Sequence, residues 1–286
     1  MNPAGFEVSD SCIGCGLCIK VCPGGVLFMG PDKRPHIRDF QEFGWNGCWQ
    51  CDHCLSVCPK GAVRIGGHDP NDSLNPPAVS ESAPLVDALI ANRHSCRRFQ
   101  QRNVPSGEIR DMIERLANAP NGGNKQQVEY TLIDDMEEMQ YFRQIVAEKM
   151  TGLAARGIYP EGFDEPSYND MKGWERTVRP DMFFCGAPHL LIPHAPCGHG
   201  EPVQDVNIAC TYFELLCASR GLGAVMLTFP LGVLRVMPEV NALLNIPDSH
   251  YTAMMIGFGF PEILYRRGAQ RKTSESRIHR LSFTTD

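Results

Sequence analysis

Eight of the thirteen cysteines in this chain fall into two copies of one spacing, C-x2-C-x2-C-x3-C-P. The first copy runs from Cys12 to Pro23 and the second from Cys48 to Pro59. A [4Fe-4S] cluster is held by four thiolates that converge on a small inorganic body, so three ligands come from one tight loop and the fourth arrives from elsewhere. The duplicated spacing therefore predicts two [4Fe-4S] clusters.

The pattern resembles that of bacterial-type ferredoxins with two clusters, in which the last cysteine of each run ligates the other cluster. The resemblance implies crossed ligand sets. Small residues in the first run, such as Gly14 and Gly16, suit such a loop because they let backbone N–H groups approach the cluster sulfurs. The implied sets are Cys12, Cys15, Cys18 and Cys58 for one cluster and Cys48, Cys51, Cys54 and Cys22 for the other.

Structural zinc is the main competing interpretation, because paired C-x2-C elements also occur in zinc ribbons. A zinc site uses four ligands and has no use for a third cysteine at the same spacing or for the Cys-Pro ending, so the iron–sulfur interpretation is favoured. A disulfide scaffold is disfavoured too, because residues 1–10 do not resemble a basic, apolar signal peptide. Since such clusters belong to reducing interiors, we expect a cytoplasmic protein.

The rest of the 286-residue chain is long enough for a second, full-sized domain. The net charge of −6 is spread without a basic block, which argues against nucleic acid and anionic membranes as partners. The apolar stretches are shorter than the roughly 18 residues that a membrane-spanning helix needs. Residues 66–77 are rich in Gly, Pro, Asn and Asp. We therefore expect a ferredoxin-like domain over 1–66, a linker over 67–83 and a larger domain over 84–286.

Helix and strand signals are mixed through the larger domain, which predicts an α+β architecture. Pro84 suits the first position of a helix, and apolar residues recur at helical spacing within Ser106–Pro120 and Val203–Arg220, with Gly221 placed to end the latter. The wide apolar face of Val203–Arg220 indicates a helix at a core or a subunit interface. Strands are expected at Tyr130–Ile133, Leu190–Ile192, Ala224–Leu227 and Ala253–Ile256.

A second concentration of chemically useful residues is the basic segment Arg93–Phe99, which directly follows the first of these helices. Arg offers planar bidentate donors and Ser adds a short hydroxyl donor, so the segment is suited to bind a phosphate. A solvated basic surface is the ordinary alternative. The motifs that follow it, Ala119–Gln126 and Gly221–Gly223, favour the phosphate interpretation.

In this order and at these distances, the three motifs resemble those of the nitroreductase family of FMN enzymes, from about Leu85 to the C-terminus. The resemblance implies a mixed, mainly antiparallel sheet flanked by helices, in an intertwined homodimer with two flavins at its interface. It also implies the FMN-binding residues: Arg93, His94, Ser95 and Arg97 at the phosphate and ring, Pro120, Asn121, Gly122 and Asn124 from the neighbouring subunit, Thr228, Phe229, Pro230 and Leu231 at the flavin N5 and O4 edge, and Arg271 at the phosphate.

The chain departs from the family pattern at some of these positions. Asn121 stands where a serine is usual, which keeps a polar contact, and Gln127-Val128 replaces a Pro-Trp pair, which alters the pocket wall. Near the C-terminus, Arg267 or Lys272 can take the phosphate-binding role of Arg271.

No catalytic side chain is predicted, because the redox chemistry is centred on the flavin. Clusters carry one electron each, whereas reduction of a nitroaromatic, a quinone or an enone takes electrons in pairs, and FMN converts between the two. The chain is therefore predicted to pass electrons from an external donor such as ferredoxin through both clusters to FMN and on to a small organic acceptor. Two alternatives stay open: an NAD(P)H-fed reductase that sends electrons out through the clusters, and an electron-transfer module without a small-molecule substrate.

Histidines near Pro193 and Pro196 form a weaker candidate site. The run His194-x2-Cys197-x-His199 contains metal-ligand residue types, but it offers no evident fourth ligand. Histidines in proline-rich loops commonly serve turns or pockets. The sequence alone therefore does not predict a metal there.

Overall fold

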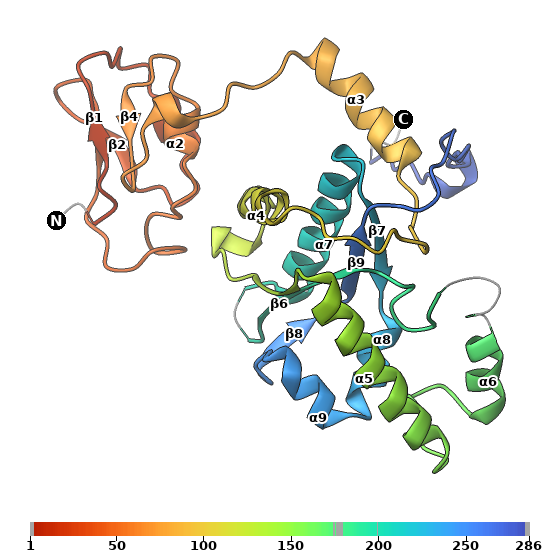
Figure 1. Ribbon diagram of the computed structural model, residues 1–286. Helices are drawn as coiled ribbons and strands as arrows, with labels where there is room; N and C mark the ends of the chain where they lie inside the picture. Colours follow the sequence, from red (N-terminus) through yellow and green to blue (C-terminus); the bar gives the residue numbers. More distant parts are fainter. Residues whose placement is uncertain (1–2, 174, 176–179, 199, 284–286) are drawn as a thin grey trace.

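The chain folds, in this computed structural model, into two parts joined by an irregular connection (Figure 1). The smaller part, residues 3–66, lies to one side of the larger part, which begins with a long helix. Within the connection, Asp69 caps the 3-10 turn η1 (Pro70–Asp72) by accepting a hydrogen bond from the backbone N–H of Asn71. The residues that the structure describes are 3–173, 175, 180–198 and 200–283.

The smaller part, called the N-terminal module below, consists of two short antiparallel sheets and two single-turn helices. β1 pairs with β4, which joins the two ends of the module, and β2 pairs with β3 as a hairpin between the cysteine runs. Each helix lies inside a cysteine run, so the sequence repeat is also a structural repeat. The elements are β1 (Glu7–Val8), α1 (Leu17–Lys20), β2 (Leu27–Met29), β3 (Pro35–Ile37), α2 (His53–Ser56) and β4 (Val63–Arg64).

The apolar core of the module is small, and cysteines form part of it. A domain of this size buries too little apolar surface to be very stable by itself and often relies on a bound metal. We therefore expect the stability of the module to depend on what its cysteines hold. The buried side chains are Ala4, Phe6, Val26, Leu27, Leu55, Val63 and Ile65, together with Cys18, Cys48 and Cys54.

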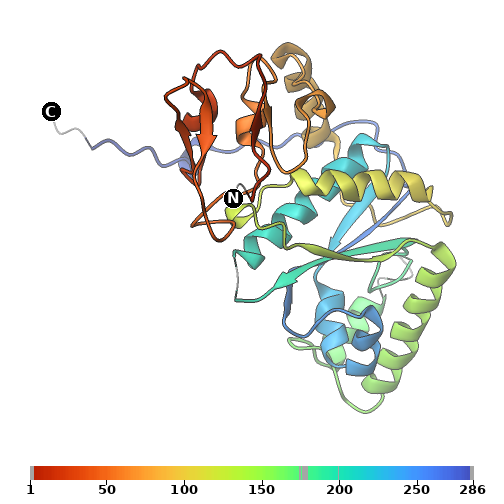
Figure 2. The ribbon, with the colours of Figure 1, turned by 90° about the vertical axis from the view of Figure 1, so that its left-hand side faces the viewer.

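The larger part is built on an antiparallel sheet with strand order β5-β6-β9-β7, and β8 also pairs with β6. Helices cover both faces of this sheet (Figures 1 and 2). The arrangement confirms the predicted α+β class with a mainly antiparallel sheet flanked by helices. The strands are β5 (Glu129–Ile133), β6 (His189–Pro196), β7 (Gly223–Leu227), β8 (His250–Thr252) and β9 (Met255–Gly259).

Alternate side chains of the central strand β6 enter two separate cores, as expected for a strand buried on both faces. Leu190 and Ile192 join the core formed with α5, α8 and α9, whereas Leu191 and Ala195 join the core formed with α4 and α7. No helix in the described part of the chain is both long and apolar enough to cross a bilayer. The helices are α3 (Val79–Asn92), α4 (Ser106–Arg115), α5 (Met136–Ala154), α6 (Glu165–Gly173), α7 (Pro202–Ser219), α8 (Phe229–Arg235) and α9 (Pro238–Asn241), with 3-10 turns η2 (Leu116–Asn118), η3 (Gly122–Asn124), η5 (Ala242–Leu244) and η6 (Glu275–Arg277).

The helix predicted from Val203 to Arg220 is confirmed as α7. It ends as the sequence indicates, because Gly221 takes a left-handed conformation with φ +68°. The N–H of Leu222 donates to the carbonyl of Cys217 at 2.9 Å, and the N–H of Gly221 donates to the carbonyl of Ala218 at 3.2 Å. These two bonds form the glycine-terminated helix end that satisfies the last carbonyls of a helix.

Two predicted element bounds are wrong. Pro84 is not the first helical residue, because α3 begins at Val79 and holds Pro84 in its interior, where the proline offers no N–H to the preceding turn. The strand predicted at Ala253–Ile256 begins too early, because residues 253 and 254 lie between β8, which ends at Thr252, and β9, which begins at Met255. The 19-residue helix α5 was not predicted.

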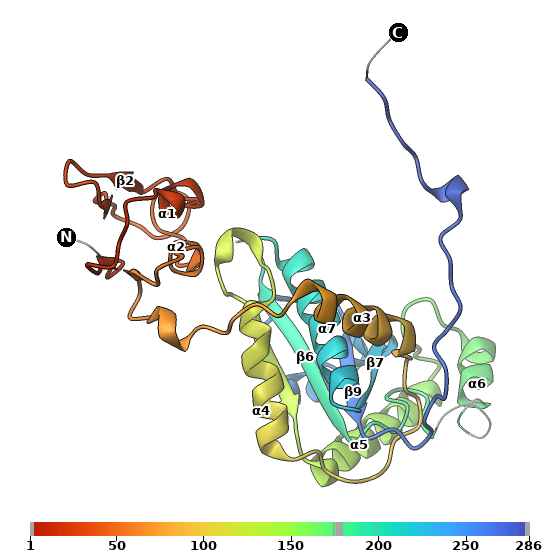
Figure 3. The same ribbon diagram turned by 90° about the horizontal axis from the view of Figure 1, so that it is seen from above.

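Two segments of the larger part carry apolar side chains that a single chain leaves exposed. On α3, Leu85 and Ile90 are 66% and 58% exposed. The C-terminal segment runs away from the body in an extended form (Figures 2 and 3), and its Leu281 and Phe283 are among the most exposed apolar side chains. Exposed apolar surface of this extent marks an interaction surface.

Candidate functional site

The eight motif cysteines line two separate cavities in the N-terminal module, and all eight are free thiols. Each cavity takes three cysteines from one run and the last cysteine from the other run. The structure therefore brings together the crossed sets that the ferredoxin resemblance implies. One cavity is lined by Cys12, Cys15, Cys18 and Cys58, and the other by Cys22, Cys48, Cys51 and Cys54.

The two cysteine loops have the same backbone conformation. The residues two and four positions after the first cysteine are left-handed in both runs: Gly14 and Gly16 in the first, Gln50 and Asp52 in the second. This conformation directs backbone N–H groups at sulfur, since Gly14 N–H donates to Cys12 Sγ at 3.5 Å and Gln50 N–H donates to Cys48 Sγ at 3.4 Å. Such bonds stabilise thiolate ligands of a cluster.

Glycine is required at Gly14 for a second reason. A Cβ at this position would lie 2.7 Å from the carbonyl oxygen of Lys33, closer than real contacts allow. In the second loop Gln50 holds the corresponding position with a positive φ of 51°.

Burial raises the pKa of the Cys18 and Cys48 thiols, and the neighbouring cysteines of each cavity raise it further. Burial is also the largest cause that raises the pKa of Cys54 to about 12. Several thiolates in one small cavity repel each other, so they need a bound cation to coexist. Four thiols around a closed cavity therefore fit a [4Fe-4S] cluster.

The module contacts the larger part at the second cysteine loop. The side-chain amide of Asn124, in η3, donates hydrogen bonds to the carbonyl oxygens of Trp49 and Gln50 at 2.9 and 3.0 Å. Figure 3 shows the turn that contains η3 beside the helix α2 of the module. Trp45 packs edge-on against Trp49, with 4.7 Å between ring centroids. The loop that holds Cys48 and Cys51 therefore lies against the motif Ala119–Gln126.

The η3 turn is fixed from the side of α7. Asp205, buried in the first turn of α7, accepts a hydrogen bond from the backbone N–H of Gly122 at 2.9 Å. The side-chain oxygen of Asn121 accepts from the backbone N–H of Gln126, also at 2.9 Å. Asn121 thus closes the turn that presents Asn124 to the module.

The basic segment lies along the other end of the sheet. Ser95 forms a parallel bridge with Ala224 of β7, and the N–H of Cys96 donates to the carbonyl of Ala224 at 2.8 Å. A Cβ at Gly223 would lie 2.6 Å from the Cβ of Cys96, so the glycine allows the segment to approach β7. Thr228, which follows β7, precedes the first residue of α8. Two predicted FMN motifs therefore adjoin the edge strand β7, the basic segment at its start and Thr228 at its end.

Arg93 forms an ion pair with Glu214 of α7, with 2.9 Å between Arg93 Nη1 and Glu214 Oε1. Glu214 is buried, and both residues line a cavity of about 400 Å³ whose wall is otherwise mainly apolar. His94 lies in the same cavity and stacks on Tyr265 with 3.9 Å between ring centroids. An arginine and a histidine beside an apolar cavity suit an anionic group attached to an aromatic ring.

The remaining predicted FMN residues do not join this cavity within one chain. Contacts with α7 show how far apart the two groups of residues lie. Gly122 contacts Asp205, and Arg93 contacts Glu214. Glu214 is nine residues after Asp205, which corresponds to about 14 Å along the helix axis. Arg271 lies on the exposed C-terminal segment. The described residues of a single chain thus leave the flavin set divided, as expected if the missing part comes from a second copy.

Sequence reasoning did not single out Glu214 or Trp49, and each has a role in these contacts. A glutamate on the mainly apolar stretch 208–218 of this helix was a signal for Glu214, because a buried carboxylate needs a partner. Trp49 stands inside the cysteine run, and its indole N–H is buried without a hydrogen-bond partner among the described residues. No pattern in the sequence indicates which surface this tryptophan meets.

The weaker candidate run near Pro196 is not assembled as its spacing suggested. Cys197 is exposed, and its backbone N–H donates to the carbonyl of Ser249. His199 lies outside the described residues. His194 is buried and has other neighbours.

Comparison with protein families assigns both parts of the chain. Residues 90–260 match the nitroreductase family, and residues 11–62 match the 4Fe-4S dicluster domain. A search of curated proteins found no significant match.

Solved structures share the fold of the larger part. A nitroreductase with bound FMN from Desulfitobacterium hafniense is 23% identical and superposes with a TM-score of 0.52, covering 68% of this chain and 96% of its own. A nitroreductase with bound FMN from Bacteroides fragilis is 17% identical with a TM-score of 0.53 and covers 71% and 99%. A BluB-like flavoprotein from Clostridium difficile is 18% identical with a TM-score of 0.53 and covers 69% and 99%.

Proposed function

The chain belongs to the nitroreductase family, and we propose that it is an FMN-dependent oxidoreductase that receives its electrons through two [4Fe-4S] clusters. The donor is an external one-electron carrier such as ferredoxin, and the acceptor is a small organic molecule of the nitroaromatic, quinone or enone type. FMN, when bound, converts between one-electron and two-electron chemistry. Since such clusters persist in reducing compartments, we place the protein in the cytoplasm.

The observation that carries this proposal is the contact between Asn124 and the backbone of Trp49 and Gln50. These two residues separate Cys48 from Cys51 in the sequence, and both cysteines line the second cavity. Asn124 belongs to the motif that lines the flavin of the neighbouring subunit in the family. The second cysteine loop therefore contacts the loop that we propose to face a flavin, and this contact supports electron transfer from the cluster to the flavin.

The protein's own groups hold the clusters in this proposal. Eight thiolates supply the ligands, in the crossed sets that line the two cavities. Backbone N–H groups of Gly14, Gln50 and Ala62 donate to Cys12, Cys48 and Cys58 Sγ, and hydrogen bonds of this kind raise the reduction potential of a cluster.

For FMN, we propose that Arg93, His94, Ser95 and Arg97 hold the phosphate and one edge of the ring. The turn Thr228–Leu231 follows the opposite end of β7 from the bridge to Ser95, and its backbone N–H groups are proposed to face the N5 and O4 edge. Glu214 orients Arg93 and offsets part of its charge. The trans set is Pro120, Asn121, Gly122 and Asn124, with Arg271 on the C-terminal segment.

A homodimer completes this site in the proposal. The divided flavin set, the exposed apolar side chains of α3 and the extended C-terminal segment with exposed Leu281 and Phe283 all support a second copy. Apolar surface of this kind is stabilised when another subunit covers it.

Steady-state turnover with two donors tests the function. Reduced ferredoxin should support reduction of a nitroaromatic, a quinone or an enone by wild type, and much less by the cluster-deficient variant Cys54→Ala. If NAD(P)H supports equal turnover in both proteins and ferredoxin supports none, the alternative of an NAD(P)H-fed reductase is correct. Cluster and flavin reduction without turnover of any acceptor would identify an electron-transfer module.

A further inference from the structure

Three polar side chains from neighbouring strands meet on one face of the sheet in the larger part, away from the motif cysteines of the N-terminal module. His194 lies on β6, directly opposite Glu129 of β5 and directly opposite Thr252 of β8. His250 is two residues before Thr252, so it shares the face of Thr252 and is a diagonal neighbour of His194. The strand register alone therefore brings Glu129, His194 and His250 together.

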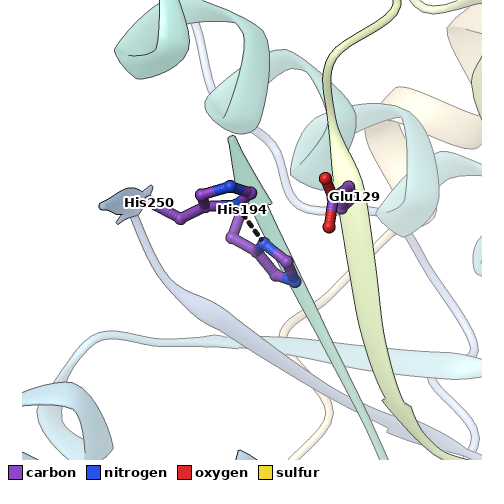
Figure 4. A group of neighbouring side chains, drawn as sticks. All are labelled: Glu129, His194 and His250. Atoms are coloured by element: carbon purple, nitrogen blue, oxygen red, sulfur yellow. Dashed lines mark hydrogen bonds between the residues drawn. The ribbon is translucent and has the colours of Figure 1, made fainter. Parts of the chain in front are cut away.

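The side chains converge as the register requires. One potential ligand atom from each of the three residues lies within 4.8 Å of the other two. The Nδ1 atoms of His194 and His250 are 2.8 Å apart (Figure 4), and Glu129 lies on the adjacent strand. Two nitrogens at a tetrahedral zinc ion, each bound at about 2.0–2.1 Å, are separated by roughly 3.3 Å. The two nitrogens lie at hydrogen-bond distance, about 0.5 Å closer than a shared zinc ion would place them, so the rings must separate slightly to bind one ion.

The hydrogen bonds of Thr131 favour one protonation form of the His194 ring. The hydroxyl of Thr131 lies 3.4 Å from the carbonyl oxygen of Leu244, to which it donates, and 3.2 Å from His194 Nε2. A hydroxyl that donates to a carbonyl can accept from a neighbour, so these contacts favour the tautomer of His194 with the proton on Nε2 and a lone pair on Nδ1 toward His250. Ligating histidines are oriented in this way by a hydrogen bond from the other ring nitrogen.

His194 is suited to remain neutral, as a metal ligand must. It is 3% exposed. Burial, followed by the neighbouring His250, lowers the pKa of His194, while the more distant carboxylate of Glu129 opposes this shift. Glu129 is exposed and His250 is half-buried, so the cluster opens to solvent on one side and a cation can enter.

We propose that Glu129, His194 and His250 bind a divalent transition-metal cation, with zinc as the reference case. The ligands are Nδ1 of His194, one ring nitrogen of His250 and one carboxylate oxygen of Glu129, and water fills the fourth position. Two imidazoles and one carboxylate favour zinc or a similar first-row ion over magnesium or calcium, which prefer oxygen ligands. The bound ion links β5, β6 and β8 and so stabilises the short strand β8.

The test is zinc binding to the cluster-loaded full chain, prepared without oxygen, because empty cluster cysteines would bind zinc themselves. Equilibrium dialysis against micromolar zinc, followed by elemental analysis, should give one zinc per chain in wild type with the iron content unchanged. His250→Gln and Glu129→Gln should each weaken zinc binding at least about tenfold, since loss of a ligand removes more than the 1.4 kcal/mol of one decade. His279→Gln, a change at an exposed histidine outside the cluster, should leave zinc binding unchanged.

X-ray absorption at the zinc edge on wild type keeps the test independent of variant folding. The expected spectrum shows nitrogen and oxygen neighbours at about 2.0–2.2 Å with imidazole scattering and no sulfur at about 2.3 Å. Added zinc should also raise the melting temperature of wild type but not of His250→Gln. Sulfur neighbours, unchanged affinity in both ligand variants, or absence of bound zinc would each overturn the proposal.

Discussion

The N-terminal module and the flavin domain present their candidate sites in opposite ways. The module gathers both sets of four cysteines around two cavities within one chain. The larger part instead holds Arg93 and Gly122 about 14 Å apart along α7 and carries Arg271 on an exposed segment. One region therefore gathers its candidate ligands within one chain, whereas we propose that a second copy of the chain completes the site of the other.

The difference follows from the size of each cofactor and from the number of chain segments that must contact it. A cluster is small and takes ligands from one tight loop and one distant cysteine. The spacing of the cysteines in the sequence therefore indicates the geometry of the cluster site. FMN is long, and its phosphate, ribityl chain and ring reach across elements and, as proposed here, across subunits.

The largest expected effect is cluster loss, and paired substitutions test the crossed ligand sets. Anaerobic wild type should hold about eight iron atoms per chain, and Cys22→Ala about four. Adding Cys51→Ala to Cys22→Ala should cost no more iron, because both serve one cluster, whereas adding Cys15→Ala should remove nearly all of it. Iron analysis of the three variants decides the point.

The exposed Cys197 provides the control, since Cys197→Ser should keep all the iron. If Cys22→Ala with Cys15→Ala retained half of the iron and Cys22→Ala with Cys51→Ala retained none, each run would hold its own cluster. The crossed assignment would then be wrong.

The next effect tests the flavin region. A charge-assisted hydrogen bond to phosphate contributes about 1.5–3 kcal/mol, so Arg93→Ala should weaken FMN binding by roughly ten- to more than a hundredfold. The substitution also leaves Glu214 buried without its partner, which destabilises the fold by itself. The variant should therefore be measured together with Glu214→Gln, by titration of flavin-free protein with FMN.

Lys149→Ala removes an ion pair with Glu239, neither of which lines the cavity of Arg93, and serves as control. The Arg93→Ala, Glu214→Gln double variant could instead bind FMN with wild-type affinity. That result would show that Arg93 does not bind the phosphate.

A smaller effect is expected at the contact between the two regions. Asn124→Ala removes two hydrogen bonds to the module, each with a net contribution of about 0.5–1.5 kcal/mol. Hydrogen exchange of the amides at 45–52 should become faster, and FMN affinity should fall up to about tenfold if Asn124 also contacts the flavin of the partner. Lys125→Ala, at the exposed neighbouring residue, should change neither quantity. Unchanged exchange at 45–52 would show that the contact does not hold the module in place.

The smallest expected effect is a change in the stability of the N-terminal module on substitution of Gln50 or Gly14, equivalent residues of the two cysteine loops. Gln50 adopts the left-handed conformation that its counterpart Gly14 adopts without strain. Gln50→Gly should therefore stabilise the module by at most about 1 kcal/mol, whereas Gly14→Ala should destabilise it, because the added Cβ meets the Lys33 carbonyl. The rate of cluster loss in denaturant measures both changes. Faster cluster loss in Gln50→Gly would contradict the account of the loop.

The cluster cysteines and α7 could be predicted from the sequence because both follow from the spacing of residues that are close together in the chain. It placed the start of α3 at Pro84, since proline favours the first turn of a helix, but the tertiary context accommodates this proline inside the helix. Tertiary contacts such as Arg93 with Glu214 or Asn124 with Trp49 join residues far apart in the chain, and no periodicity encodes them. The same holds for His250, which only the register of β8 brings to His194.

The central claim is that electrons reach the flavin from the clusters, and the rate of flavin reduction by reduced ferredoxin tests it most directly. The comparison uses rapid mixing of wild type and of Cys54→Ala that retains FMN, each followed at the flavin absorbance. The account predicts fast reduction in wild type and much slower reduction in the variant, because the cluster beside the Asn124 contact is lost. Equal rates in the two proteins would contradict it and show that ferredoxin reduces the flavin directly.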